Sequence, residues 1–192
     1  MPTPNSAVMD FLLTRRSRPA KTLAAPYPTR EDLTDILTAA ARTPDHGKLE
    51  PWRFIVMGKD ALVRVAGEIA TLGPKLGYDA EAIEKQTSTY ETAGLAVVVV
   101  SAPVDSPKVP QIEQVYSAGA ACLALVNAAL ASGWGANWLS GWPSHDPEIC
   151  ARGFGLKPGE KIAGIIHLGT ERAAPPERPR PDLDQITTWD GV

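Results

Sequence analysis

The run LAVVVVS at residues 95–101 decides which kind of fold this chain can adopt. Six of its seven residues are apolar, and four are valine, whose branched side chain favours extended backbone. An unbroken apolar run of this length, unlike an alternating one, is typical of a strand covered on both faces. We therefore expect residues 95–101 to form a fully buried central strand.

Similar runs on either side predict the rest of the fold. Residues 52–57 and 162–168 have the composition of strands, and residues 133–139 that of a turn followed by a short strand. Apolar residues three and four positions apart fill the intervals and indicate helices. We expect these at 6–14, from Thr29 to about Arg42, around 62–69, at about 78–91, at 117–132 and at 147–153. Strands alternating with helices predict an α+β or α/β fold, in one domain covering residues 1–192.

The predicted helix at 117–132 is apolar on nearly every side. A helix of this kind has to be covered all round, and a single domain of this size rarely covers one helix so completely. We therefore expect part of its surface to lie in a subunit interface.

Composition and charge exclude several classes of protein. The net charge is −3 and the pI is about 5.6, so a nucleic-acid partner held by charge is not expected. No apolar run approaches the roughly 20 residues that cross a bilayer, and the N-terminus lacks a signal core, so we expect a cytoplasmic protein with no membrane partner. The two cysteines, Cys122 and Cys150, are isolated in sequence and fit small buried apolar residues.

Searches for chemical motifs return few matches. The chain has no GxGxxG, no Walker A loop and no GxSxG, which argues against a Rossmann dinucleotide site, a P-loop and a nucleophile elbow. Its histidines, His46, His145 and His167, lack the spacing that places two metal ligands on one helix face, so no metal site is expected. His167 falls in the last predicted strand, where we expect a core or edge histidine with its hydrogen bonds satisfied.

Three separate segments nevertheless fit a ligand that carries an anion. Arg15-Arg16-Ser17 offers two guanidinium groups and a hydroxyl at the end of a helix. Residues 41–52, ARTPDHGKLEPW, place an arginine and a histidine in a short connection, and residues 133–141, GWGANWLSG, combine small residues with tryptophans that can wall a flat ligand. Solvated arginines and a glycine-rich turn with core tryptophans are the alternative explanation of these segments.

Taken in order, the motifs resemble those of the nitroreductase family, homodimeric flavoenzymes that bind FMN. The match covers essentially the whole chain: RRS, then R-x-P-D-H-x-x-x-x-P-W, the apolar strand, the alanine-rich helix and the final GIIHLGT. The PDH sequence is similar to that of the short, minimal members. The resemblance implies a mostly antiparallel sheet flanked by helices, an intertwined homodimer, and a tail at about 175–192 that packs on the partner subunit.

The resemblance also implies roles for individual residues. Arg42 and His46 would reach the FMN of the neighbouring subunit. Within one subunit, the phosphate, ribityl chain and ring of FMN would be held by Arg15, Arg16, Ser17, Trp138, Leu139, Ser140 and Arg180. The minimal members often lack the basic tail residue that corresponds to Arg180. No separate catalytic side chain is expected, because the flavin carries the chemistry and solvent supplies protons.

The implied activity is a ping-pong transfer of hydride from NADH or NADPH, through FMN, to a nitroaromatic, quinone or other small electrophile. Leu139 departs from the minimal members, which carry an arginine after the tryptophan, so one positive charge is missing from that side of the site. Two alternatives stay open: a flavin-binding or interaction homodimer with little or no turnover, and a dehalogenase or enone reductase on the same scaffold.

Overall fold

The computed structural model describes residues 3–191, and its centre is an antiparallel sheet. The strands follow the order β1-β5-β3-β2, and β4 pairs with β5. They are β1 (Leu23–Ala24), β2 (Trp52–Gly58), β3 (Leu95–Ser101), β4 (Gly135–Leu139) and β5 (Lys161–Glu171). Every pairing is antiparallel, so the α+β alternative is confirmed, and so is the antiparallel sheet that the family resemblance implies.

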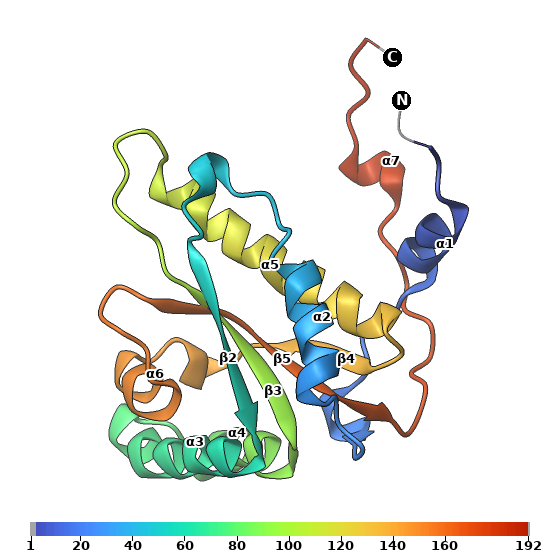
Figure 1. Ribbon diagram of the computed structural model, residues 1–192. Coiled ribbons are helices and arrows are strands. Elements are labelled where there is room, and N and C mark those ends of the chain that lie inside the picture. Colours follow the sequence, from blue (N-terminus) through green and yellow to red (C-terminus); the bar gives the residue numbers. More distant parts are fainter. Residues whose placement is uncertain (1–2, 192) are drawn as a thin grey trace.

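The central strand β3 is buried along its whole length, as predicted. Its side chains alternate between two cores. Val98 and Val100 face a layer made by α3, α4 and α6, whereas Val97 and Val99 face a layer made by α2 and α5 (Figure 1). The helices are α1 (Ser6–Thr14), α2 (Arg30–Ala40), α3 (Lys59–Leu72), α4 (Ala80–Thr92), α5 (Gln111–Ala131), α6 (Pro147–Phe154) and α7 (Leu183–Ile186). The seven-residue apolar run is needed because both faces of the strand are covered.

Helix α2 begins at the predicted cap. Thr29 accepts a hydrogen bond from the backbone N–H of Asp32, and the Asp32 carboxylate accepts one from the backbone N–H of Thr29. This reciprocal arrangement satisfies donors that a helix N-terminus leaves free. The helix ends at Ala40, where the Thr43 hydroxyl donates to the Ala40 carbonyl, two residues earlier than predicted.

Helix α5 is longer than the sequence pattern predicts, since it begins at Gln111 and not at residue 117. Its first turns carry polar residues that hide the periodicity. Gln114 is buried and bonds both the N–H and the carbonyl of Val104, which ties the preceding loop to the helix. At 21 residues α5 is the one described helix long and apolar enough to cross a membrane by length and composition, but its inner face packs on the sheet, as a core helix does.

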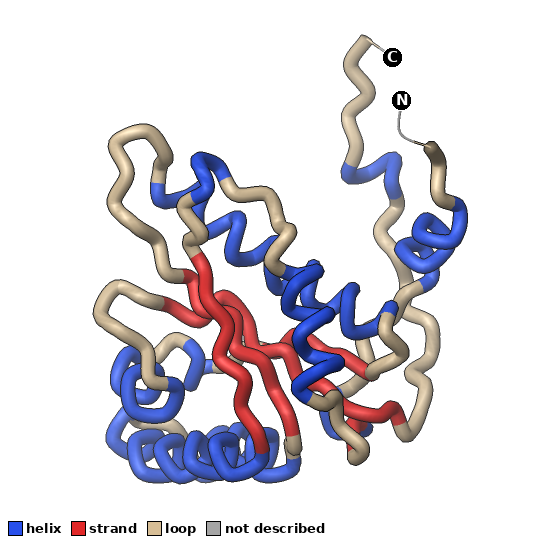
Figure 2. Tube along the Cα trace, viewed as in Figure 1, coloured by secondary structure: helices blue, strands red, loops and turns tan. Residues whose placement is uncertain are grey.

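One face of α5 is left uncovered by the rest of the described chain. Its exposed large apolar residues recur at helical spacing and are Ile112, Val115, Tyr116 and Leu123. Helices α1 and α7 are apolar and exposed as well, and both stand away from the sheet (Figure 2). The structure thus leaves exposed apolar side chains on α1, α5 and α7, and for two of these elements, α5 and the tail that contains α7, the sequence analysis expects contact with a second subunit.

Gly135 lies where β4 passes closest to its neighbours. A Cβ at this position would overlap the Leu23 side chain and lie 3.0 Å from the Gly169 carbonyl oxygen. We expect Gly135→Ala to destabilise the fold by about 1–3 kcal/mol through overpacking. Gly67, in the exposed part of α3, has open space around it, so Gly67→Ala should stabilise by about 0.5–1 kcal/mol. Urea unfolding of both variants measures the difference; equal effects would contradict the close approach at Gly135.

Candidate functional site

Three predicted arginines meet at the end of α1. Arg15 is the C-terminal cap of α1, and its Nη2 donates to the Ser17 hydroxyl at 3.0 Å. Arg16 donates to the Pro176 carbonyl at 3.0 Å, so the tail runs beside this segment. Arg180, further along the tail, approaches the Arg15 carbonyl oxygen at 3.5 Å. We name the group Arg15, Arg16, Ser17 and Arg180 the cationic corner.

The cationic corner holds more positive charge than its neighbours neutralise. Burial lowers the pKa of Arg15, and the charges of Arg180 and Arg16 lower it further. The Nε atoms of Arg15 and Arg16 are buried and have no hydrogen-bond partner among residues 3–191. Glu177 accepts a 2.8 Å bond from Arg180, but it lies 3.9 Å from Arg16, which is too far for a hydrogen bond. Clustered guanidinium groups with donors free fit a phosphate group.

Backbone contacts fix this corner against β4. The N–H of Arg18 donates to the Ala136 carbonyl at 2.8 Å, and the Asn137 side chain donates to the Arg18 carbonyl at 2.8 Å. Trp138 lies over Gly164 of β5, where a Cβ would overlap the indole. The structure therefore brings together two of the three predicted segments, residues 15–18 and residues 136–140.

A groove of about 510 Å³ lies between residues 19–21, β4 and α4. Its walls are Pro19, Ala20, Lys21, Lys85, Ser88, Thr89, Thr92, Asn137 and Leu139. The volume is within the range of small-molecule sites. Two lysines, Lys21 and Lys85, line it, and no acidic residue of the described chain does. Sequence analysis missed both lysines, because no motif marks Lys21 in the turn before β1 or distinguishes Lys85 within the polar segment before β3.

A smaller cavity of about 190 Å³ adjoins the groove, and Leu139 and Ser140 both line it. The remaining walls are Lys85, Gln86, Thr89, Tyr90, Gly141, Ile165 and His167. The expectation that His167 has satisfied hydrogen bonds is wrong. The residue is 3% exposed, its Nδ1 has no partner within residues 3–191, and burial lowers its pKa to about 4. The sequence feature that could have revealed this buried histidine is its position inside the apolar run of β5.

The third predicted segment lies elsewhere in the subunit. Residues 43–48 pack on the first turns of α5, where Ser117 donates to the Pro44 carbonyl at 2.7 Å and His46 Nδ1 lies 2.6 Å from Glu113 Oε2. In Figure 1 this connection is on the opposite side of the view from α1 and α7. Arg42 and His46 are exposed, so within one subunit they do not join the cationic corner.

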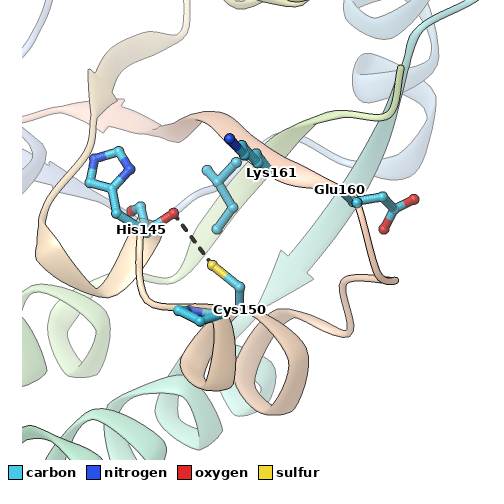
Figure 3. A pocket seen from close by; sticks show the side chains of 8 residues that line it. His145, Cys150, Glu160 and Lys161 are labelled. Atoms are coloured by element: carbon cyan, nitrogen blue, oxygen red, sulfur yellow. Dashed lines mark hydrogen bonds between the residues drawn. The ribbon is translucent and has the colours of Figure 1, made fainter. Parts of the chain in front are cut away.

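A further pocket, of about 470 Å³, lies around Cys150 (Figure 3). The Cys150 thiol points toward the Ser144 carbonyl at 3.3 Å, and burial raises its pKa to about 11, so it stays protonated. Glu160 is held by Arg53 at 2.7 Å. Cys122 is also free and buried, so the expectation of two buried cysteines is confirmed. Residues 3–191 contain no cluster of three or more potential metal ligands.

These features define a class of protein: an α+β fold with a cationic corner beside a groove that fits a flat, phosphate-bearing ligand. The sequence profile of the nitroreductase family matches residues 12–170. The chain belongs to the nitroreductase family. An Escherichia coli (strain K12) protein provisionally named NAD(P)H nitroreductase YdjA is 37% identical over 162 residues, which cover 84% of this chain and 87% of the relative. A Haemophilus influenzae protein provisionally named NAD(P)H nitroreductase is 34% identical over 165 residues, with the same coverage.

Solved structures share the fold. A nitroreductase-like protein from Bacillus cereus superimposes with a TM-score of 0.76 at 22% identity and covers 100% of both chains. A provisionally named nitroreductase from Desulfovibrio desulfuricans, solved in complex with FMN, gives a TM-score of 0.74 at 19% identity over 99% of both chains. The nitroreductase-like fold expected from the motifs is therefore confirmed.

Proposed function

We propose that the protein is an FMN-dependent NAD(P)H oxidoreductase that reduces small electrophiles such as nitroaromatics and quinones. The observation that carries the proposal is the cationic corner, whose Arg15, Arg16 and Ser17 precede in sequence the residues 19–21 that line a groove of about 510 Å³. Family membership supports the same activity, as do relatives named NAD(P)H nitroreductases and a fold neighbour that binds FMN.

The residues present fit FMN. The free donors of Arg15 and Arg16, with Arg180 beside them, would hold the phosphate. Ser17 would bond the ribityl chain, and residues 138–140, at the end of β4, would line the ring. Lys85 would supply the positive charge that Leu139 does not, and positive charge beside a reduced flavin favours its anionic form. When bound, FMN supplies the centre that accepts and donates hydride.

Completion of the site would require a second subunit. Arg42 and His46 lie on an exposed connection at the start of α5, next to the uncovered apolar face that includes Tyr116. Pairing two copies along this face would cover it and bring Arg42 and His46 toward the groove of the partner subunit. The tail at about 175–192, with its exposed Leu183, Ile186 and Trp189, would then pack on the partner.

The visible absorption spectrum of the purified protein tests the proposal. We expect bands near 370 and 450 nm, the usual positions for oxidised flavin, and loss of the second band on anaerobic addition of NADH or NADPH. The same preparation should have a mass in solution of about twice 20.5 kDa. A flavin that never bleaches would identify a binding dimer without turnover, and protein that takes up no FMN would refute the cofactor assignment.

A further inference from the structure

His167 is the one histidine of the described chain that is both buried and lacks a partner at Nδ1. It lies on β5 and lines the 190 Å³ cavity beside Gln86, Tyr90 and Ser140. A buried imidazole nitrogen without a partner costs free energy, unless a group in the cavity bonds it. The side chains of Lys85, Gln86, Thr89, Tyr90 and Ser140 bring polar groups to its wall, beside the apolar Leu139 and Ile165. The cavity has room for several water molecules, since each needs about 10–15 Å³ of this kind of volume.

Burial keeps His167 neutral, since it lowers the pKa of the imidazole to about 4. Tyr90, from α4, has its ring centroid 6.3 Å from that of His167, and burial raises the pKa of Tyr90 to about 12, so this side chain is neutral too. Lys85 is the charged residue of the cavity wall. Ser140, which follows β4, and Ile165 of β5 bring no charge. A neutral imidazole can accept a proton at one nitrogen while it releases one from the other.

The cavity and the groove are neighbours that share three wall residues, Lys85, Thr89 and Leu139. The proposed reaction needs a proton at this place. Hydride from NAD(P)H accounts for two electrons and one hydrogen, so the acceptor needs one further proton from solvent to become the two-hydrogen product. Leu139 lines both spaces, so it lies between the groove, where the acceptor would bind, and the cavity.

Building on the proposed function, we propose that the cavity is a water-filled proton relay and that His167 is its positioning residue. A proton enters from solvent past Lys85 and passes to one imidazole nitrogen. The other nitrogen gives up its proton to cavity water, which carries it to the acceptor in the groove. The imidazole ends each transfer neutral with its proton on the other nitrogen, and a flip of the ring or proton exchange with cavity water restores the first tautomer. The transferred proton forms the second new bond to hydrogen on the acceptor.

Ring N–H exchange of His167, in flavin-free protein labelled with ¹⁵N-histidine, tests the cavity directly. The resonance is assigned by its loss in His167→Gln. We expect the ring N–H to exchange with water much faster than the backbone N–H groups of Ile165 and Ile166, which lie in the central sheet. A ring N–H as protected as those amides would mean that no water reaches it, and would overturn the relay.

Separate measurement of the two half-reactions tests the role in turnover. In His167→Gln, which keeps a hydrogen-bonding group but cannot pass a proton, reduction of a quinone should slow about 10²-fold, with an altered solvent deuterium isotope effect. Bleaching of the flavin by NAD(P)H should keep its rate, because hydride arrival needs no proton. His145 is exposed and lies outside the groove and the cavity, so His145→Gln is the control that should change neither step.

Each result decides the relay. Quinone reduction at the wild-type rate in His167→Gln would overturn it, and equal slowing of both half-reactions would show structural damage in place of a relay. Protein that takes up no FMN would instead refute the proposed function. In that case the exchange of the His167 ring N–H with water is the remaining test. Protection from exchange overturns the relay, and rapid exchange supports the water-filled cavity.

Discussion

Replacing Arg15 by alanine is expected to weaken FMN binding by about 10²-fold. A hydrogen bond to a charged group contributes roughly 1.5–3 kcal/mol, and a factor of ten corresponds to about 1.4 kcal/mol. Arg15 is half-buried, and its Nε has no partner among residues 3–191. Burial lowers its pKa, and the neighbouring charges of Arg180 and Arg16 lower it further. A phosphate would therefore relieve repulsion and also accept hydrogen bonds. Titration of flavin-free protein with FMN, followed by quenching of flavin fluorescence, gives the dissociation constant.

The tail offers a matched control for this prediction. Arg180 approaches Arg15, whereas the side chain of Arg178 makes no hydrogen bond or ion pair within the described residues. We expect Arg180→Ala to weaken binding, and Arg178→Ala to leave it within about twofold, since surface changes of this kind have small effects. Equal losses for the two variants would mean that net charge, and not the cationic corner, attracts the flavin. Affinity that is unchanged in Arg15→Ala would contradict the phosphate assignment.

Local sequence predicted the elements whose causes are local. The six apolar residues of β3 required burial on both faces, and the structure provides it. The Thr29–Asp32 cap also needed only neighbouring residues. The start of α5 was missed because Gln114, a polar residue, is buried by its bonds to Val104, which no helical periodicity reveals.

The site depended on contacts between distant parts of the chain. Arg15 meets Arg180 across 165 positions, and Asn137 meets Arg18 across 119. Sequence analysis selected these regions by chemistry and by resemblance, but spacing alone could not place them together. Lys85 escaped notice because its role follows from the groove wall and not from a motif. His167 was assigned to the strand correctly, but the cavity that leaves Nδ1 without a partner forms only when α4 packs beside β4 and β5.

The buried histidine should make the fold sensitive to acid. Burial lowers the pKa of His167 to about 4 in the folded protein, against about 6.5 in an unfolded chain. Above pH 6.5 the imidazole is neutral in both states and does not affect stability. As the pH falls from 6.5 toward 4, the unfolded chain takes up the proton first, so unfolding is favoured. The loss approaches about 3 kcal/mol at pH 4, since one pKa unit corresponds to about 1.36 kcal/mol.

His167→Gln isolates this contribution, because glutamine keeps a polar side chain that does not titrate. Urea unfolding of the flavin-free proteins, at one protein concentration and at several values between pH 7 and pH 4, gives the free energy of unfolding for each. Carboxylates that titrate in this range affect both proteins and cancel in the difference. Between pH 7 and pH 4, the wild type should lose about 3 kcal/mol more than the variant.

Parallel curves would mean that His167 accepts a proton without cost, either because water solvates its charged form or because a wall residue such as Gln86 turns to bond it. In that case its folded pKa lies near 6.5, and the imidazole would be partly charged at neutral pH.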